Sequence, residues 1–146
     1  MMLPPLNSAG DLPPGIHPAG WEEIESRFGK GAPRRSSALA KLRHLHELAA
    51  RTGALERFLI FGSFVSSKAE PHDVDIVLVM RNEFRLEDAP RESRTLFSHP
   101  DAEARFGASV FWVRQGMLPD ELMQEFLETW QIKRDGSKRG LLEVEP

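Results

Sequence analysis

Apolar residues recur at helical spacing in three stretches of the chain. From Ser36 to Gly53 they recur every three or four positions, which predicts an amphipathic helix with Ser36 or Ser37 as its N-cap. The same spacing predicts a short earlier helix that ends at Gly29, and a later helix over residues 119–130 with a proline in its first turn. Each of these helices has one apolar face to bury against another element.

Continuous apolar runs predict four β-strands. Residues 58–61 form a short buried strand, and residues 74–80 are apolar enough for a central strand that is buried on both faces. Residues 108–113 are rich in β-forming side chains. Residues 141–144 are expected to return as a strand after a hairpin turn at Asp135 and Gly136.

The start of the chain differs in composition from the rest. Residues 1–18 contain five prolines and two glycines, which break helices and strands, so they predict an extended arm that either wraps the domain or stays mobile. Brief helices are expected within residues 66–70 and near residues 90–96. The order of helices and strands predicts one α/β (α+β) domain over residues 19–146, with a small mixed β-sheet and helices mainly on one face.

Composition narrows the class of protein. A chain of 146 residues with 40% hydrophobic residues has the usual size of one domain with a real core. The absence of cysteine excludes disulfides, thiolate zinc sites and cysteine nucleophiles, so any metal must be held by carboxylates, histidines or water. The first residues lack the features of a secretory signal and no segment is long enough to span a bilayer, which predicts a cytoplasmic protein. Trp21, Trp112 and Trp130 occupy core-facing positions, which predicts packing roles and no base-stacking platform.

The net charge of −3 gives the chain no basic excess of the kind that dedicated nucleic-acid binders carry. Two cationic clusters are nevertheless present, the first with Lys30, Arg34, Arg35, Lys41, Arg43 and Arg51, and the second with Lys133, Arg134, Lys138 and Arg139. Charge runs usually keep a surface solvated, so we interpret both clusters as solvated faces in preference to phosphate-binding patches.

The segment 61–77 contains the residues with the clearest chemistry. Residues two apart in a strand point to the same side, so Asp73 and Asp75 place two carboxylates together at the start of a strand. Such a pair repels itself unless a cation lies between, and Mg²⁺ or Mn²⁺ suits oxygen ligands of this kind. The alternative is a pair of ordinary turn and strand-start acids, but five apolar residues follow Asp75, which leaves its charge at a nearly buried position. The pattern favours a metal site.

A turn suited to phosphates precedes these acids. Gly62 permits close approach of a ligand to the backbone, and Ser63 adds a hydroxyl where a brief helix with free N–H groups is expected. Lys68 either neutralises phosphate or is a solvated surface lysine, and the sequence leaves both interpretations open. His72 is expected to belong to the turn before the strand.

The order of a hydrophobic strand, Gly-Ser, a spacer and Asp-x-Asp within a second hydrophobic strand resembles the signature of the polymerase-beta-like nucleotidyltransferases, in particular their small stand-alone bacterial members. This signature covers residues 58–80. The resemblance implies that Gly62 and Ser63 contact a triphosphate and that Asp73 and Asp75 ligate one or two Mg²⁺ ions. It also implies transfer of a nucleoside monophosphate from an NTP, with ATP the first candidate, to a protein hydroxyl or an RNA end.

One departure from the family pattern leaves a second function open. Family members commonly use a third carboxylate on a neighbouring strand, whereas residues 108–113 contain no acid. The nearest acids, none at an obvious position, are Asp101, Glu103, Asp120 and Glu121. Loss of a general base typically costs about 10²- to 10⁴-fold in rate, so the alternative is a weak or inactive nucleotide-binding or partner-binding module, as in toxin-antitoxin systems. The chain has little room for an added helical domain, so a protein partner or a homodimer is expected to supply the acceptor surface.

Overall fold

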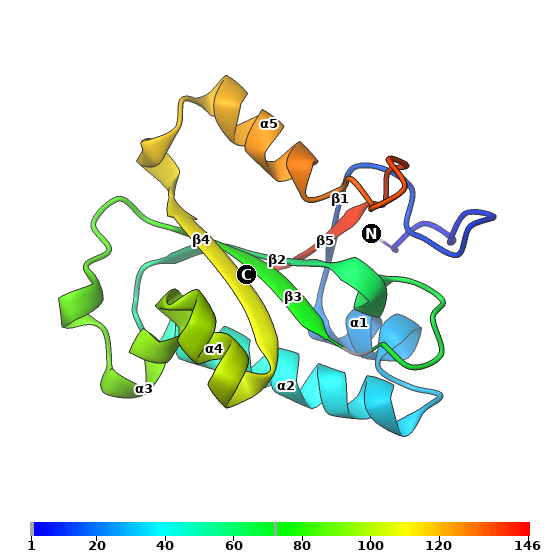
Figure 1. Ribbon diagram of the computed structural model, residues 1–146, viewed down its shortest axis with the longest axis horizontal. Helices are drawn as coiled ribbons and strands as arrows, with labels where there is room; N and C mark the ends of the chain where they lie inside the picture. The colour runs from blue at the N-terminus through cyan, green and yellow to red at the C-terminus, as the bar shows by residue number, and fades with distance from the viewer. Residues whose placement is uncertain (1, 72) are drawn as a thin grey trace.

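A computed structural model describes residues 2–71 and 73–146, and within these residues the chain forms one five-stranded mixed sheet in the order β1-β5-β2-β3-β4 (Figure 1). The strands are β1 (Ile16–Ala19), β2 (Leu55–Phe61), β3 (Val74–Met80), β4 (Ala108–Arg114) and β5 (Leu141–Val144). β1 and β5 are parallel, as are β3 and β4, whereas β2 runs antiparallel to both of its neighbours. The prediction of a mixed α/β fold is confirmed.

The helices of the described chain are α1 (Trp21–Phe28), α2 (Pro33–Ala50), α3 (Arg91–Arg94), α4 (His99–Phe106) and α5 (Asp120–Thr129). The three helices expected from periodicity are present, as is the helix near residues 90–96, whereas α4 was not predicted. The cap prediction for α2 is wrong. The helix begins at Pro33, whose fixed φ suits the first turn, and Ala32 is the N-cap. Ser36 therefore lies inside the helix, and its hydroxyl donates to the carbonyl of Gly29. No described helix is both long and apolar enough to cross a membrane.

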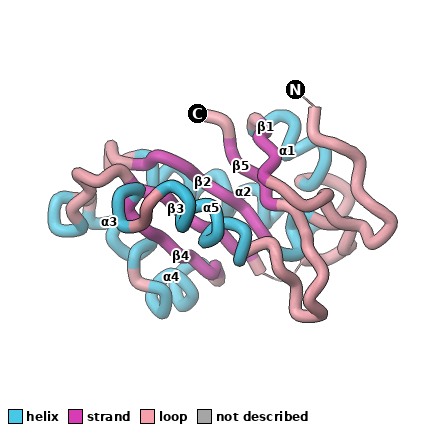
Figure 2. Tube along the Cα trace, turned by 90° about the horizontal axis from the view of Figure 1, so that it is seen from above, coloured by secondary structure: helices cyan, strands magenta, loops and turns pink. Residues whose placement is uncertain are grey.

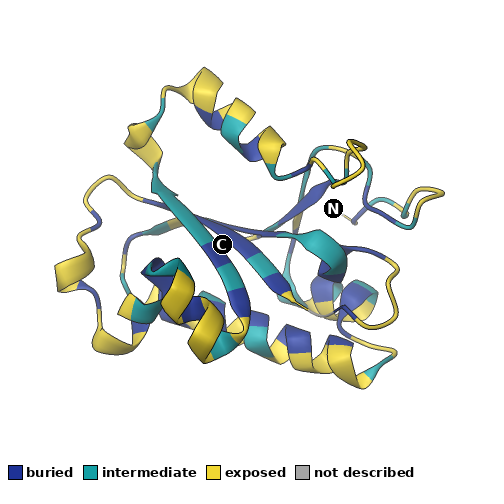
Figure 3. Cartoon of the chain, in the orientation of Figure 1, coloured by how far each residue is buried: buried dark blue, intermediate teal, exposed yellow. Residues whose placement is uncertain are grey.

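The two faces of the sheet are covered differently, because α1, α2 and α4 lie beneath it and α5 lies across the other side (Figures 1 and 2). Ile76 and Leu78 of β3 belong to the large core on the α2 side. Val77 and Val79 of the same strand belong to a smaller cluster under α5. β3 is thus a central strand buried on both faces, as predicted, and α5 exposes most of its outer surface (Figure 3).

The end of the chain forms a strand with partners that the sequence did not predict. Asp135 and Gly136 form the expected turn, since Gly136 has a φ of +87° and Ile132 pairs with Lys138. β5 then runs between β1 and β2 rather than beside the segment that precedes it. The C-terminal hairpin, residues 131–139, is therefore a separate projection from the sheet (Figure 1).

The proline-rich start of the chain wraps the domain. Leu3 is 5% exposed and Leu12 is fully buried in the main core. The guanidinium of Arg27 on α1 donates to the carbonyls of Leu3 and Pro4. The last residues of the predicted arm are paired, because Ile16–Ala19 form β1 beside β5.

Candidate active site

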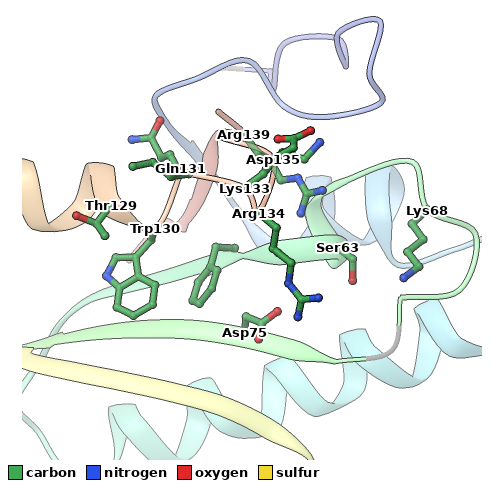
Figure 4. A pocket seen from close by; sticks show the side chains of 13 residues that line it. Ser63, Lys68, Asp75, Thr129, Trp130, Gln131, Lys133, Arg134, Asp135 and Arg139 are labelled. Carbon is green, nitrogen blue, oxygen red and sulfur yellow. The ribbon is translucent and has the colours of Figure 1, made fainter. Parts of the chain in front are cut away.

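A cavity of about 800 Å³ lies where β2 ends and β3 begins, between the sheet and the C-terminal hairpin (Figure 4). Its size is within the range of small-molecule sites. It is lined by Phe61, Gly62, Ser63, Lys68, Asp75, residues 129–135 and Arg139. The structure thus brings four of the five predicted site residues into one cavity, and it adds the hairpin as a wall that was not predicted.

Gly62 occupies a position that only glycine fits. The chain leaves β2 and enters a 3₁₀ turn, Gly62–Val65, with a φ of +82° at Gly62. A Cβ at this position would lie 2.3 Å from Oδ2 of Asp75, closer than any real contact. The carboxylate of Asp75 therefore packs directly against the Gly62 backbone, and the close approach of a ligand to this backbone stays a prediction.

The short helix expected within residues 66–70 is absent, and the turn at Gly62–Val65 takes its place. The loop that follows this turn is held by Arg35 on α2. The buried Arg35 guanidinium donates to the carbonyls of Phe64 (3.0 Å) and Ser66 (2.6 Å), and also to that of Lys68. The Ser66 hydroxyl donates to the carbonyl of Ser63 at 2.6 Å.

The interpretation of Arg35 as part of a solvated charge run is wrong. Burial lowers the pKa of Arg35, but an arginine stays charged under ordinary conditions. It therefore lies beneath the turn as a fixed cation with several carbonyl partners. The sequence spacing of Arg35 indicates its burial, because Arg35 precedes the core residue Leu39 by one helical turn and so lies on the buried face of α2.

Asp75 lies in the middle of a row of three side chains that crosses the sheet. In the strand register it pairs with Phe61 of β2 on one side and Ser109 of β4 on the other. Burial raises the pKa of Asp75 to about 6, and the charge of Asp73 adds to this rise. A hydrogen bond from Ser109 and the positive charge of Arg139 act in the opposite direction. The ionised form of Asp75 is therefore poorly stabilised by the protein alone.

Asp73 lies just before β3, exposed, and it does not line the cavity, although its charge reaches Asp75. The prediction for His72 lies outside the described residues. Over the rest of the chain, no group of three or more histidines and acids is placed to hold a metal. The two aspartates nevertheless fit Mg²⁺, which commonly takes one or two protein carboxylates and completes its shell with phosphates and water. A cation would also offset the repulsion from Asp73, which adds to the rise in the pKa of Asp75 caused by burial.

The position beside Asp75 on the neighbouring strand β4 is occupied by Ser109 and therefore supplies no third acid. The four acids nearest in sequence to β4, Asp101, Glu103, Asp120 and Glu121, are exposed and none lines the cavity. Asp135 does line the cavity, but its carboxylate accepts hydrogen bonds from the backbone and the hydroxyl of Ser137. These bonds lower the pKa of Asp135. Asp135 therefore stabilises its own turn.

The C-terminal cationic cluster faces the cavity, which corrects its interpretation as a solvated face. Lys133, Arg134 and Arg139 line the cavity, whereas Lys138 does not. An acid of the N-terminal arm pairs with two of these cations. Asp11, which is 2% exposed, forms ion pairs with Lys133 (2.8 Å) and Arg139 (2.7 Å).

Trp130 combines the predicted packing role with a place in the cavity wall. Its ring packs against Phe61 at 5.0 Å and Phe111 at 4.5 Å between centroids. It is only partly buried and contributes to the cavity lining. Its buried indole nitrogen has no hydrogen-bond partner within the described residues.

A family model described as a family of unknown function, DUF6932, matches residues 4–145. The chain belongs to this family. No curated protein and no solved structure matches it. The part of this DUF6932 member that the model matches includes the N-terminal arm, the sheet and the hairpin, so every residue of the cavity wall lies within the family region.

Proposed function

We propose that this DUF6932 member is a Mg²⁺-dependent nucleotidyltransferase that moves a nucleoside monophosphate from an NTP to a hydroxyl of a protein or an RNA. The observation that carries the proposal is the contact between the Gly62 turn and the carboxylate of Asp75 at the mouth of β2 and β3. A turn that suits phosphates and a carboxylate that suits their metal thus share one cavity.

Each predicted residue has a role in this proposal. Asp73 and Asp75 would hold Mg²⁺ or Mn²⁺, which when bound neutralises phosphate charge and orients the α-phosphate for in-line attack. Gly62 and Ser63 offer backbone and hydroxyl donors to the phosphates. Lys68 lines the same cavity, which favours its phosphate role over the solvated one.

The transfer balances without a further reactant. The acceptor oxygen forms a bond to the α-phosphorus, the bond from that phosphorus to the bridging oxygen of the β-phosphate breaks, and pyrophosphate leaves. The hydroxyl proton is released to water. Within the described chain two carboxylates line the cavity: Asp75, which is proposed to hold the metal, and Asp135, which is bound by Ser137. Neither is free to take this proton, so a slow reaction is expected.

Ser109 supports a second function from another class. Because the position beside Asp75 holds a hydroxyl instead of an acid, the same cavity suits a module that binds a nucleotide without transferring it. In this alternative, the module works through a protein partner or a second copy of the chain, as in toxin-antitoxin systems.

Transfer of label from α-labelled NTPs separates the two functions. Purified protein is incubated with each NTP in turn, starting with ATP, in Mg²⁺ or Mn²⁺ and with host lysate as the source of acceptors. Wild type is compared with Asp73→Asn, Asp75→Asn and the control Glu121→Gln, an exposed acid outside the cavity. Label that depends on both aspartates and not on Glu121 supports the enzyme. Nucleotide binding without label, by folded protein, supports the binding module.

A further inference from the structure

The cavity has a second cationic wall opposite the Gly62 turn, formed by the C-terminal hairpin (Figure 4). Four cations line the described cavity, and three of them, Lys133, Arg134 and Arg139, come from this hairpin. The function proposed above assigns no role to any of the three.

Two of the hairpin cations share one acid. Lys133 and Arg139 bind the two carboxylate oxygens of Asp11, which is almost completely buried. Because Asp11 carries a single negative charge, these three residues keep one net positive charge, and the charge of Arg139 still reaches Asp75. Among the described residues, Arg134 is the hairpin cation of the cavity lining that forms no ion pair.

Asp11 also links the hairpin to the loop after the Gly62 turn. Its backbone pairs with Ser66, and the carbonyl of Gly10 accepts a hydrogen bond from the backbone of Ser67 at 2.8 Å. The arm thus contacts both walls of the cavity. Asp11 therefore ties one wall of the cavity to the other.

Arg134 is the residue of the hairpin whose side chain is placed to bind a ligand in the cavity. It is exposed, it forms no ion pair in the part of the chain that the structure describes, and its side chain extends from the hairpin toward Asp75 (Figure 4). A guanidinium suits phosphate because it offers several donors in one plane. Among the described residues that line the cavity, Lys68 is the other cation without an ion pair, and it lies near the negative charge of Asp75, to which Asp73 adds.

We propose that Arg134 is a substrate-binding residue that grips the triphosphate from the side opposite Gly62 and Ser63, and that Asp11 is the positioning residue that holds the hairpin for it. This inference rests on the proposed function, because an NTP supplies the triphosphate. It assigns the C-terminal hairpin and the N-terminal arm to the site, although both lie outside the Gly-Ser and Asp-x-Asp segment.

Binding of inorganic tripolyphosphate tests the role of Arg134 directly. Titration calorimetry in Mg²⁺ compares wild type with Arg134→Ala, Arg134→Lys and the control Lys138→Ala, which removes a cation from the same hairpin outside the cavity. Arg134→Ala should weaken binding about tenfold, Arg134→Lys should recover part of the loss, and Lys138→Ala should bind like wild type. Equal losses for Arg134→Ala and Lys138→Ala, or no loss for either, would overturn the proposal.

This probe separates the inference from the proposed function, because tripolyphosphate has no nucleotide to transfer. Tripolyphosphate binding that depends on Arg134, in a protein that transfers no label, supports the phosphate-binding role of Arg134 and contradicts the nucleotidyltransferase activity. Label transfer with an NTP KM unchanged by Arg134→Ala supports the activity and contradicts the role of Arg134.

The positioning role of Asp11 is tested with Asp11→Asn, alone and combined with Arg134→Ala. If Asp11 acts through the hairpin, Asp11→Asn weakens tripolyphosphate binding in wild type and has a much smaller effect once Arg134 is absent. Tighter binding by Asp11→Asn would show that Asp11 only subtracts charge, and equal effects in both backgrounds would show that it does not act through Arg134. Circular dichroism of each variant confirms that the comparison is made between folded proteins.

Discussion

The two faces of the sheet differ in whether they can hold a charged residue. The α2 face is closed, with Leu42 and Leu78 fully buried in the main core. The α5 face contains a smaller apolar cluster and, beside it, the cavity with Asp75. Both faces are built from alternate residues of the same strands. The closed face packs β3 into the core, while the open face leaves the charge of Asp75 at the cavity, because that charge would be costly inside an apolar core. A small domain can thus keep a costly site if the opposite face of its sheet supplies the stability.

Matched leucine truncations on the two faces should give the largest effects. Leu42→Ala on α2 removes a side chain from the larger core and should lower the free energy of unfolding by about 4 kcal/mol. Leu127→Ala on α5 removes an equally buried leucine from the smaller cluster, where the helix can settle, and should cost about 2 kcal/mol. Urea unfolding measures both. Equal losses would mean that the two faces stabilise the fold to the same degree.

Loss of the cation beneath the turn should come next. Arg35→Met leaves several buried carbonyls without their donor and should cost about 2–3 kcal/mol, with faster amide hydrogen exchange in residues 64–68. The exposed Lys30→Ala, from the same charge run, should change stability by less than about 0.5 kcal/mol. A mild effect of Arg35→Met would show that water replaces the guanidinium and that the loop is not held by it.

Two glycines with similar φ angles allow the cost of backbone strain to be measured apart from the cost of a clash between a new Cβ and Asp75. Gly62→Ala combines a φ of +82° with a Cβ that meets Asp75, and should cost about 2 kcal/mol and abolish nucleotide binding. Gly53→Ala has a φ of +73° but meets nothing within 4 Å, so strain alone should cost about 1 kcal/mol. Thermal unfolding and nucleotide titration measure the pair. Identical behaviour would remove the argument that the turn and Asp75 are fitted to each other.

A further effect is a change in the pH dependence of stability at Asp75. Because the folded protein raises the pKa of Asp75 to about 6 from an ordinary value of 3.8, the folded state binds more protons than the unfolded state between these values. Stability from this group is therefore complete below about pH 4 and is lost as pH rises through 6. Without Mg²⁺, Asp75→Asn should gain stability over wild type on going from pH 4 to pH 7, by urea unfolding.

A matched measurement sharpens this last prediction. Glu121→Gln, an exposed acid on α5, should show no change relative to wild type over the same range. Addition of Mg²⁺ should stabilise wild type at pH 7 and leave Asp75→Asn nearly unchanged, because a bound cation offsets the repulsion from Asp73. An Asp75→Asn profile parallel to that of wild type would contradict the raised pKa.

Much of the fold could be predicted because local patterns coincide with long-range packing. The 74–80 run is apolar on both sides and lies in the middle of the sheet, and α2 and α5 follow their apolar spacing. The pairing of β5 could not be predicted, since its four residues are compatible with either edge or centre of a sheet. α4 was missed because only Ala102 of its eight residues is buried, which leaves little apolar periodicity to detect.

The site was predicted in part for the same reason. Gly62, Ser63, Lys68 and Asp75 lie within one short segment, so their meeting in one cavity follows from two neighbouring strands. The charge run around Arg35 did not reveal its role, because a solvated run implies exposure of every member, whereas Arg35 lies on the buried face of α2. The metal and the transfer reaction remain predictions.

Local patterns in the sequence indicated most of the elements: four of the five strands, the three amphipathic helices, the short helix near residues 90–96, and a glycine turn that precedes a pair of acids. The tertiary fold brings Arg134 and Arg139 into the cavity with Asp75 and pairs Asp11 with Arg139, and no local spacing records a pairing between residues 128 positions apart. Their meeting depends on β5 running between β1 and β2, which brings both ends of the chain to the mouth of the central strands. Long-range pairing is selected by the sum of buried area and satisfied charge over the whole domain, and a sequence pattern reports only its local part.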